Sequence, residues 1–259
     1  MELQELLLLT FIAALITDLS TGLGAVPFFF VPTLSDRVKG LFTAGAAGMM
    51  TSASVLQLLG EGAALVEGWA IWEVGLGVLL GAWVFMLASQ WVRDHEQFDI
   101  GGLRSSGGAV SMLIVAALTI HSLPEGIAIG VAYGATPETG DTAFGLSVAL
   151  ALAVHNIPEG TAITVALRGQ GVSTLRCMGW AVVSSIPQPL GAVPAAWMVW
   201  LFEPLLPAGL GFAAGAMMYL VVDELLPDAY EDAGHGGVAV AFMAGLVAMM
   251  MLGRAVGIS

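Results

Sequence analysis

The chain is poor in cysteine and in basic residues, and each shortage narrows what it can do. A single cysteine, Cys177, among 259 residues excludes an internal disulfide and a zinc site built from several thiolates. Only seven lysines and arginines stand against 20 acidic residues, and a formal net charge of −13 makes nucleic acid an unsuitable partner. The sequence also has no P-loop motif, so ATP is not the implied energy source.

The acidic balance has two explanations. Many carboxylates with few lysines keep proteins soluble in a salt-rich cytoplasm, and acidic loops also gather cations. The sequence leaves a halophilic host and a cation-collecting surface as equal alternatives.

Apolar residues, in contrast, are abundant. They make up 58% of the chain and charged residues 10%, against about 45–50% and about 25% in soluble domains. An α-helix needs about 20 apolar residues to cross a hydrocarbon core of about 30 Å. We therefore predict a single all-α membrane domain over residues 1–259, a bundle of eight transmembrane helices near residues 6 to 31, 41 to 60, 70 to 91, 108 to 134, 143 to 167, 176 to 201, 208 to 226 and 237 to 257.

The basic residues indicate how the chain is oriented in the membrane. Six of the seven follow the first, third or fifth predicted span: Arg37, Lys39, Arg93, Arg104, Arg168 and Arg176. With an even number of spans, the positive-inside rule places these segments in the cytoplasm and both termini outside it. The acidic start of the chain is unlike a signal peptide, so we expect the first helix to be retained in a multi-pass protein of the cell membrane.

Two near-copies of one polar motif interrupt the fourth and fifth spans. They read His-Ser-Leu-Pro-Glu-Gly from His121 and His-Asn-Ile-Pro-Glu-Gly from His155. A histidine and a carboxylate at membrane depth are expensive, so their repetition indicates a functional site. Because each motif lies about halfway along its helix, we expect the two copies to meet at the same depth.

The spacing within each motif is that of a helical ligand face. Residues four apart on a helix lie on one side of it, so each histidine shares a face with its glutamate. An uncharged oxygen donor stands three residues before each glutamate and extends the set. The spacing predicts the metal ligands His121, Ser122, Glu125, His155, Asn156 and Glu159.

A proline sits inside each motif and adds to this expectation. Pro124 and Pro158 have no N–H to donate to the carbonyl four residues earlier, which predicts kinked helices with free backbone oxygens at Ile120 and Val154. In a membrane such a carbonyl is tolerated where it faces protein or a water-filled path. The free oxygens are further cation ligands beside the His/Glu pairs.

The ligand types narrow the metal. Imidazole and carboxylate without thiolate suit zinc, iron(II), manganese, cobalt or nickel better than copper(I). The thirteen methionines are soft copper ligands in principle, but they do not sit with the motif, and core packing explains them better. The competing interpretation, buried His–Glu hydrogen bonds that only lock two helices together, is weakened by the second copy.

The two motifs resemble the His-Asn/Ser-x-x-Glu-Gly signatures on the fourth and fifth transmembrane helices of ZIP (Zrt-/Irt-like protein) divalent metal transporters. The eight-span topology agrees, and the segments 21–25 and 214–227 look like the prokaryotic branch of this family. The resemblance implies import of divalent transition metal ions into the cytoplasm, above all Zn²⁺, with Fe²⁺, Mn²⁺, Co²⁺ and Cd²⁺ as further substrates. It also implies a homodimer. The metal is then the transported substrate and no cofactor is needed.

The same resemblance implies a ligand set that is often binuclear. It makes His121, Glu125, His155 and Glu159 direct ligands, and Ser122 and Asn156 members of the same or the adjoining metal position. The sixth span contributes a further glutamate in some members, whereas here it offers Gln188. Coordination through the Gln188 amide oxygen and a hydrogen bond between helices are both open for this residue.

A second function class fits the motifs less well. A metal-dependent enzyme embedded in the membrane would also use carboxylate-bound metal inside a helical bundle. A transporter, however, needs polar residues strung from one face of the membrane to the other. Asp18 in the first span, the two motifs, and Asp223-Glu224 in the seventh supply such a series, although Asp18 has a plain alternative role in bonding to neighbouring hydroxyls.

Overall fold

The computed structural model describes residues 2–31, 35–94, 109–136, 142–169 and 171–255, and all regular structure in these ranges is helical. The prediction of an all-α protein is confirmed. The chain begins with α1 (Leu3–Thr21), η1 (Gly22–Phe29), α2 (Asp36–Ser52), η2 (Ala53–Leu58), α3 (Leu59–Ala64), η3 (Gly68–Ala70) and α4 (Ile71–Asp94). It continues with α5 (Ala109–Gly134), α7 (Ala143–Gly169), α8 (Thr174–Ser185), α9 (Pro187–Leu201), η5 (Glu203–Leu205), α10 (Leu206–Leu220), η6 (Val221–Leu225), α11 (Leu226–Ala233) and α12 (His235–Ala255).

The helices are built to face lipid. Within the described ranges, six continuous helical stretches are long and apolar enough to cross a membrane: Leu3–Phe29, Asp36–Ala64, Gly68–Trp91, Ala143–Val165, Leu206–Ala233 and His235–Ala255. Large apolar side chains point outward, as Trp69 and Val240 show with exposures of 92% and 72%. Polar residues such as Asp18, Glu125 and Gln188 are buried instead. This inverted arrangement is that of a membrane protein.

Proline has different effects in different predicted spans. The fourth corresponds to α5, a single helix of 26 residues that stays continuous through Pro124, as α7 does through Pro158. The sixth is divided by a turn at Ile186 into α8 and α9, of 12 and 15 residues. The division has a local cause, because Pro187 and Pro189 lack the N–H groups that would continue the α8 hydrogen bonds.

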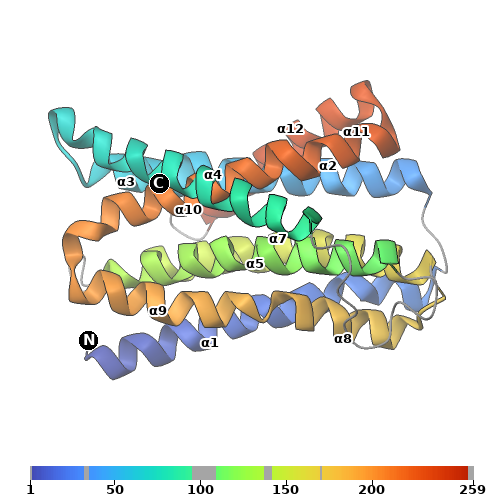
Figure 1. Ribbon diagram of the computed structural model, residues 1–259, viewed down its shortest axis with the longest axis horizontal. Coiled ribbons are helices and arrows are strands. Elements are labelled where there is room, and N and C mark those ends of the chain that lie inside the picture. The colour runs from blue at the N-terminus through green and yellow to red at the C-terminus, as the bar shows by residue number, and fades with distance from the viewer. Residues whose placement is uncertain (1, 32–34, 95–108, 137–141, 170, 256–259) are drawn as a thin grey trace.

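The helices form two layers, which Figure 1 shows one above the other. One layer contains α2, α4, α10 and α12, in which α4 packs on α10 and α2 on α12. The other contains α1, α5, α8 and α9, in which the most extensive contact joins α5 to α9. Helix α7 packs against α1, α5 and α8 and also reaches α2. The two repeated motifs therefore lie on neighbouring helices, α5 and α7.

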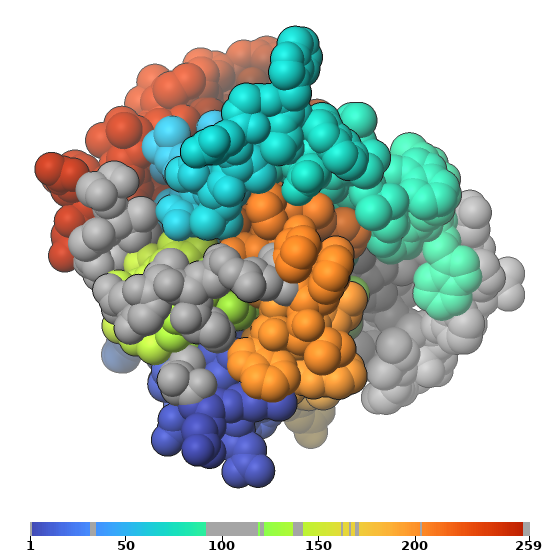
Figure 2. Space-filling view, turned by 90° about the vertical axis from the view of Figure 1, so that its left-hand side faces the viewer, coloured from blue at the N-terminus to red at the C-terminus, as the bar shows by residue number. Residues whose placement is uncertain are grey.

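Both termini lie toward the same end of the molecule, at the left of Figure 1. Figure 2 looks at that end and shows the beginning of the chain, in blue, below, and the red α12 above. An even number of membrane crossings produces this arrangement, as the eight predicted spans require.

Glycines let the helices around the motifs approach closely. A Cβ atom on Gly160 of α7 would overlap the carbonyl oxygen of Thr21 on α1. A Cβ atom on Gly126 of α5 would likewise overlap the backbone of Gln188 on α9. These two contacts press α1 and α9 against the motif helices at the residues that follow Glu159 and Glu125.

The small residues of α2 are used within the chain. Gly45 contacts Gly245 on α12 backbone to backbone, and a Cβ on Gly48 would overlap the Phe242 carbonyl oxygen. The small residues of α2 therefore pack against α12. The homodimer stays a prediction.

Candidate metal centre

Three residues from the two motifs converge in the interior of the bundle. Glu125 of α5 and His155 and Glu159 of α7 each offer one ligand atom, and these atoms lie within 4.8 Å of one another. All three side chains are buried. Because His155 and Glu159 are one helical turn apart, they share the face of α7 that looks toward α5. The structure thus brings the two motif copies together, as their matched depth predicts.

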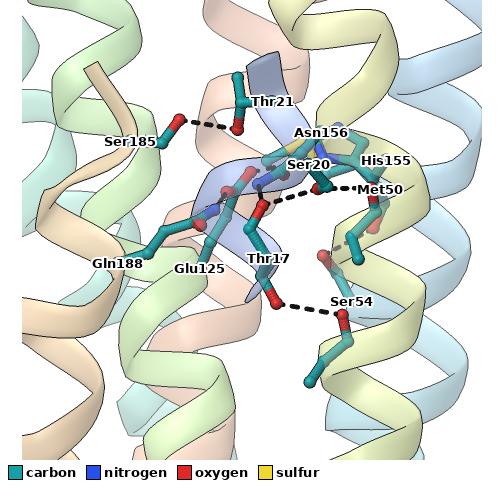
Figure 3. A network of polar contacts seen from close by, with 12 residues as sticks. Thr17, Ser20, Thr21, Met50, Ser54, Glu125, His155, Asn156, Ser185 and Gln188 are labelled. Atoms are coloured by element: carbon teal, nitrogen blue, oxygen red, sulfur yellow. Dashed lines mark hydrogen bonds and ion pairs between the residues drawn. The ribbon is translucent and has the colours of Figure 1, made fainter. Parts of the chain in front are cut away.

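Glu125 has a different partner on each side. The Gln188 side-chain amide on α9 donates a hydrogen bond to Glu125 Oε2. On the other side, Glu125 Oε1 lies 3.4 Å from Nδ1 of His155. Figure 3 shows Gln188 and Glu125 pointing toward each other, with His155 beyond them. Gln188 therefore makes the hydrogen bond between helices that the sequence left as one of two roles, and its own Oε1 has no hydrogen-bond partner among the described residues.

The Asn156 side chain is hydrogen-bonded to α1. Its Nδ2 donates to the Thr17 carbonyl oxygen over 3.0 Å, and its Oδ1 is buried without a hydrogen-bond partner in the described part of the chain. The amide is therefore held by α1 with its oxygen still available. Asn156 stands three residues before Glu159, so the two share a face of α7.

The centre has many oxygen acceptors and few donors. Neither carboxylate oxygen of Glu159 has a hydrogen-bond partner among the residues that the structure describes, and the same holds for both His155 nitrogens. A buried carboxylate without a donor or a counter-charge is costly, by several kcal/mol on the scale of ion desolvation. A bound cation offsets this cost, because it supplies positive charge to the atoms that lack partners.

For two further predicted ligands, His121 and Ser122, the structure shows the helix that carries them. His121 belongs to α5, one turn before Glu125, but its side chain lies outside the described residues. Ser122 is buried on α5, three residues before Glu125. Both therefore stay predicted ligands.

Hydroxyl groups of α1, which the sequence marks only as neighbours of Asp18, tie this helix to the site. Thr17 donates to the Ala149 carbonyl oxygen over 3.3 Å, and Ser20 donates to that of Ala153 over 2.8 Å. Ser185 at the end of α8 donates to the Thr21 hydroxyl over 2.9 Å. Figure 3 shows these residues beside the centre. The only signal in the sequence is the density of polar residues between positions 17 and 21, which names no partner helix.

A cavity of about 490 Å³ lies elsewhere, where η1 meets the end of α7 and the start of α8. Its lining includes Arg168, Thr174 and the phenylalanines at 28–30. The Arg168 guanidinium donates to the Thr174 hydroxyl over 3.0 Å, so a cation entering the cavity would meet a positive charge. The cavity is therefore not the metal centre.

A direct match of sequence agrees with the motifs, the all-helical bundle and the buried centre. The family model of the ZIP zinc transporter covers residues 93–256, which include both motifs. The chain belongs to the ZIP zinc transporter family. The expected resemblance is confirmed, and membership of a transporter family removes the alternative of a membrane-embedded enzyme.

Relatives within the ZIP family cover nearly the whole chain. The zinc transporter GufA of Myxococcus xanthus is 34% identical over 95% of this chain and 98% of its own length. The zinc transporter ZIPB of Bordetella bronchiseptica is 34% identical over 92% of this chain and 78% of its own length. A protein of Arabidopsis thaliana is 38% identical over 90% of this chain, which spans only 36% of that longer protein.

Proposed function

We propose that this ZIP protein carries divalent transition metal ions across the cell membrane into the cytoplasm. Zn²⁺ is the first substrate to test, since GufA and ZIPB are both named zinc transporters. Fe²⁺, Mn²⁺, Co²⁺ and Cd²⁺ are the further substrates that an imidazole and carboxylate ligand set accommodates.

The observation that carries this proposal is the buried convergence of Glu125, His155 and Glu159. Their ligand atoms lie within 4.8 Å of one another, and the oxygens of Glu159 have no hydrogen-bond partner among the described residues. Intramembrane carboxylates usually pair with one another, with cations or with a transported ion. A divalent cation satisfies the two carboxylates and the imidazole at once.

The geometry also suits an ion that has to leave again. Structural zinc sites are closed by four protein ligands, whereas sites with three protein ligands keep a position for water or another donor. Among the described side chains, the cluster of Glu125, His155 and Glu159 provides three. A hydrated ion exchanges part of its water for these ligands, and it leaves when water or protons compete for them.

The orientation of the chain in the membrane follows from the placement of the basic residues. Arg37 and Lys39 begin α2, and Arg168 and Arg176 flank the turn between α7 and α8. Figure 1 shows the starts of α2 and α8 at the end opposite the two termini. The positive-inside rule makes this end cytoplasmic and places both termini outside. Uptake then runs from the end with the termini to the end with the basic residues.

Uptake of zinc into proteoliposomes tests the proposal. The full chain is reconstituted with an internal zinc-sensitive dye, and wild type is compared with the double variant Glu125→Gln/Glu159→Gln. The control is Glu73→Gln, in the first turn of α4, which removes one carboxylate away from the centre.

We expect zinc uptake by wild type and Glu73→Gln, and a loss of at least tenfold in the double variant. Zinc that binds to the wild type and never enters the vesicles would contradict transport. Undiminished uptake by the double variant would contradict the assignment of the centre.

A further inference from the structure

The cavity of about 490 Å³ lies at the level where two apolar helical stretches end. Its lining comes from η1, the end of α7 and the start of α8. The first apolar stretch of the chain ends at Phe29, and that of α7 ends at Val165, shortly before Arg168. Figure 1 shows the start of α8 at the end of the molecule opposite the two termini. The cavity therefore stands at headgroup depth, where the hydrocarbon core gives way to the polar interface.

The polar wall of the cavity is built around Arg168. Its Nη1 donates to the Thr174 hydroxyl over 3.0 Å, and that hydroxyl donates to the Phe28 carbonyl oxygen over 3.4 Å. Thr174 is only 8% exposed, so its hydroxyl is a fixed point that orients the guanidinium. The described residues that line the cavity include no acid. This wall is therefore positively charged, in a chain whose formal net charge is −13.

The first turn of α8 adds backbone donors to the same wall. Ser173, Thr174 and Leu175 all line the cavity. Ser173 precedes the helix, and its side chain makes no capping hydrogen bond among the described residues. The first N–H groups of a helix have no acceptor within it, so they favour an anion. The guanidinium, the hydroxyl and these N–H groups together suit the oxygens of a phosphate.

The rest of the lining is apolar and exposed. Phe29, Phe30 and Leu175 are 54%, 83% and 69% exposed. Such side chains, at the edge of the hydrocarbon core, contact acyl chains more favourably than water. A free phosphate ion would occupy only the charged wall, whereas the phosphate of a lipid brings its own apolar chains. The volume of about 490 Å³ also lies in the range of cavities that hold an organic ligand rather than a small ion.

We propose that this cavity binds the phosphate group of an anionic membrane phospholipid, with Arg168 as its charged contact and Phe30 and Leu175 beside the acyl chains. A lipid with a cationic headgroup fits less well, because Arg176 adds a second positive charge in the first turn of α8. The site shares no residue with the metal centre. The orientation proposed above places it in the cytoplasmic leaflet, whose surface is negatively charged.

Native mass spectrometry of the purified full chain tests the inference. The protein in detergent is titrated with dioleoylphosphatidylglycerol or with dioleoylphosphatidylcholine, and inorganic phosphate is added as a competitor. Arg168→Gln removes the charge of the cavity, and its control is Arg37→Gln, which removes an exposed charge on α2. Leu175→Ser changes an exposed side chain and so leaves the packing intact. Its control is Leu201→Ser, at the end of α9 and 63% exposed.

We expect wild type to bind the phosphatidylglycerol about tenfold more tightly than the phosphatidylcholine, the effect of one hydrogen bond to a charged group. Arg168→Gln should lose this preference, and Arg37→Gln should keep it. Leu175→Ser should weaken phosphatidylglycerol binding by about threefold through lost apolar contact, whereas Leu201→Ser should not. Equal binding of the two lipids by wild type, or a preference that survives Arg168→Gln, overturns the inference.

The competitor separates a lipid from a free anion. Inorganic phosphate that binds as tightly as the phosphatidylglycerol and displaces it would make a free anion the ligand and overturn the lipid assignment.

The outcome is separable from that of the proposed function. The Glu125→Gln/Glu159→Gln variant should bind the phosphatidylglycerol like wild type, because neither carboxylate lines the cavity. A failure of zinc uptake therefore leaves the lipid site standing, and a loss of lipid preference leaves the metal centre standing.

Discussion

The side-chain amide of Gln188 on α9 donates a hydrogen bond to Glu125 on α5. A neutral donor orients the carboxylate without cancelling its charge, so Glu125 Oε1 stays directed at His155, 3.4 Å from Nδ1. Gln188 of α9 thereby positions the Glu125 carboxylate, which lies beside His155 of α7. This arrangement explains how an amide fits where a further carboxylate would repel Glu125.

Gln188→Glu should tighten zinc binding and slow release. The new carboxylate adds a third negative charge to a centre that has two. The attraction for a cation becomes stronger, and the cation leaves the centre more slowly. We expect an affinity about tenfold higher by calorimetry, with slower uptake at saturating zinc. Gln188→Met, which is uncharged and of similar length, is the control. Unchanged affinity and stoichiometry in Gln188→Glu would show that position 188 does not reach the ion.

Glu159→Gln should stabilise the metal-free protein and abolish its stabilisation by zinc. The substitution removes a buried charge that has no hydrogen-bond partner in the described part of the chain and stands near two other carboxylates. Function and stability oppose each other at such sites. Thermal unfolding in detergent, with and without zinc, measures both effects. A zinc-induced rise of Tm in Glu159→Gln equal to that of wild type would contradict a ligand role.

The sequence alone predicts much of this centre because its ligands are local. His155 and Glu159 are one helical turn apart, and that spacing holds wherever the helix lies in the fold. The contacts to α1 and α9 are different. Thr17 lies 139 positions before Asn156, and Glu125 lies 63 before Gln188. Only the packed bundle decides such pairs, so the amide partners of the centre could not be predicted from spacing.

Gly160→Ala should impair both folding and transport, because its Cβ would overlap the Thr21 carbonyl oxygen. Overpacking of this kind costs about 1–3 kcal/mol, and here it pushes α1 away from Asn156. Gly75→Ala on α4 is the matched control, since nothing lies within 4 Å of its added Cβ. The control should be neutral or stabilising by up to about 1 kcal/mol. Equal unfolding temperatures for the two variants would contradict the close packing of α1 on α7.

Zinc affinity should fall as the pH falls. Carboxylates and imidazole must be deprotonated to bind metal, so acid adds protons that compete with the ion and binding at higher pH releases fewer of them. Competition with a zinc dye across the range from pH 8 to pH 5 measures this trend. An affinity that rises toward acid, or stays constant, would exclude titratable ligands such as His155 and Glu159.

The fold shows the same division between local and long-range information. Hydrophobic length is enough to predict the membrane helices, and it places α12 within a few residues. It does not predict the turn at Ile186 between α8 and α9, because the apolar run continues through it and only Pro187 marks the change. That turn puts Gln188 in the first turn of α9, beside Glu125.

The central claim is that zinc is held by Glu125, His155 and Glu159, and locating the ion tests it most directly. Anomalous diffraction at the zinc edge from crystals of the zinc-loaded protein should show a peak about 2.0–2.2 Å from a His155 nitrogen and from carboxylate oxygens of Glu125 and Glu159. The peak should vanish in Glu125→Gln/Glu159→Gln crystals. A peak elsewhere in the bundle, with none among these three side chains, would contradict the account.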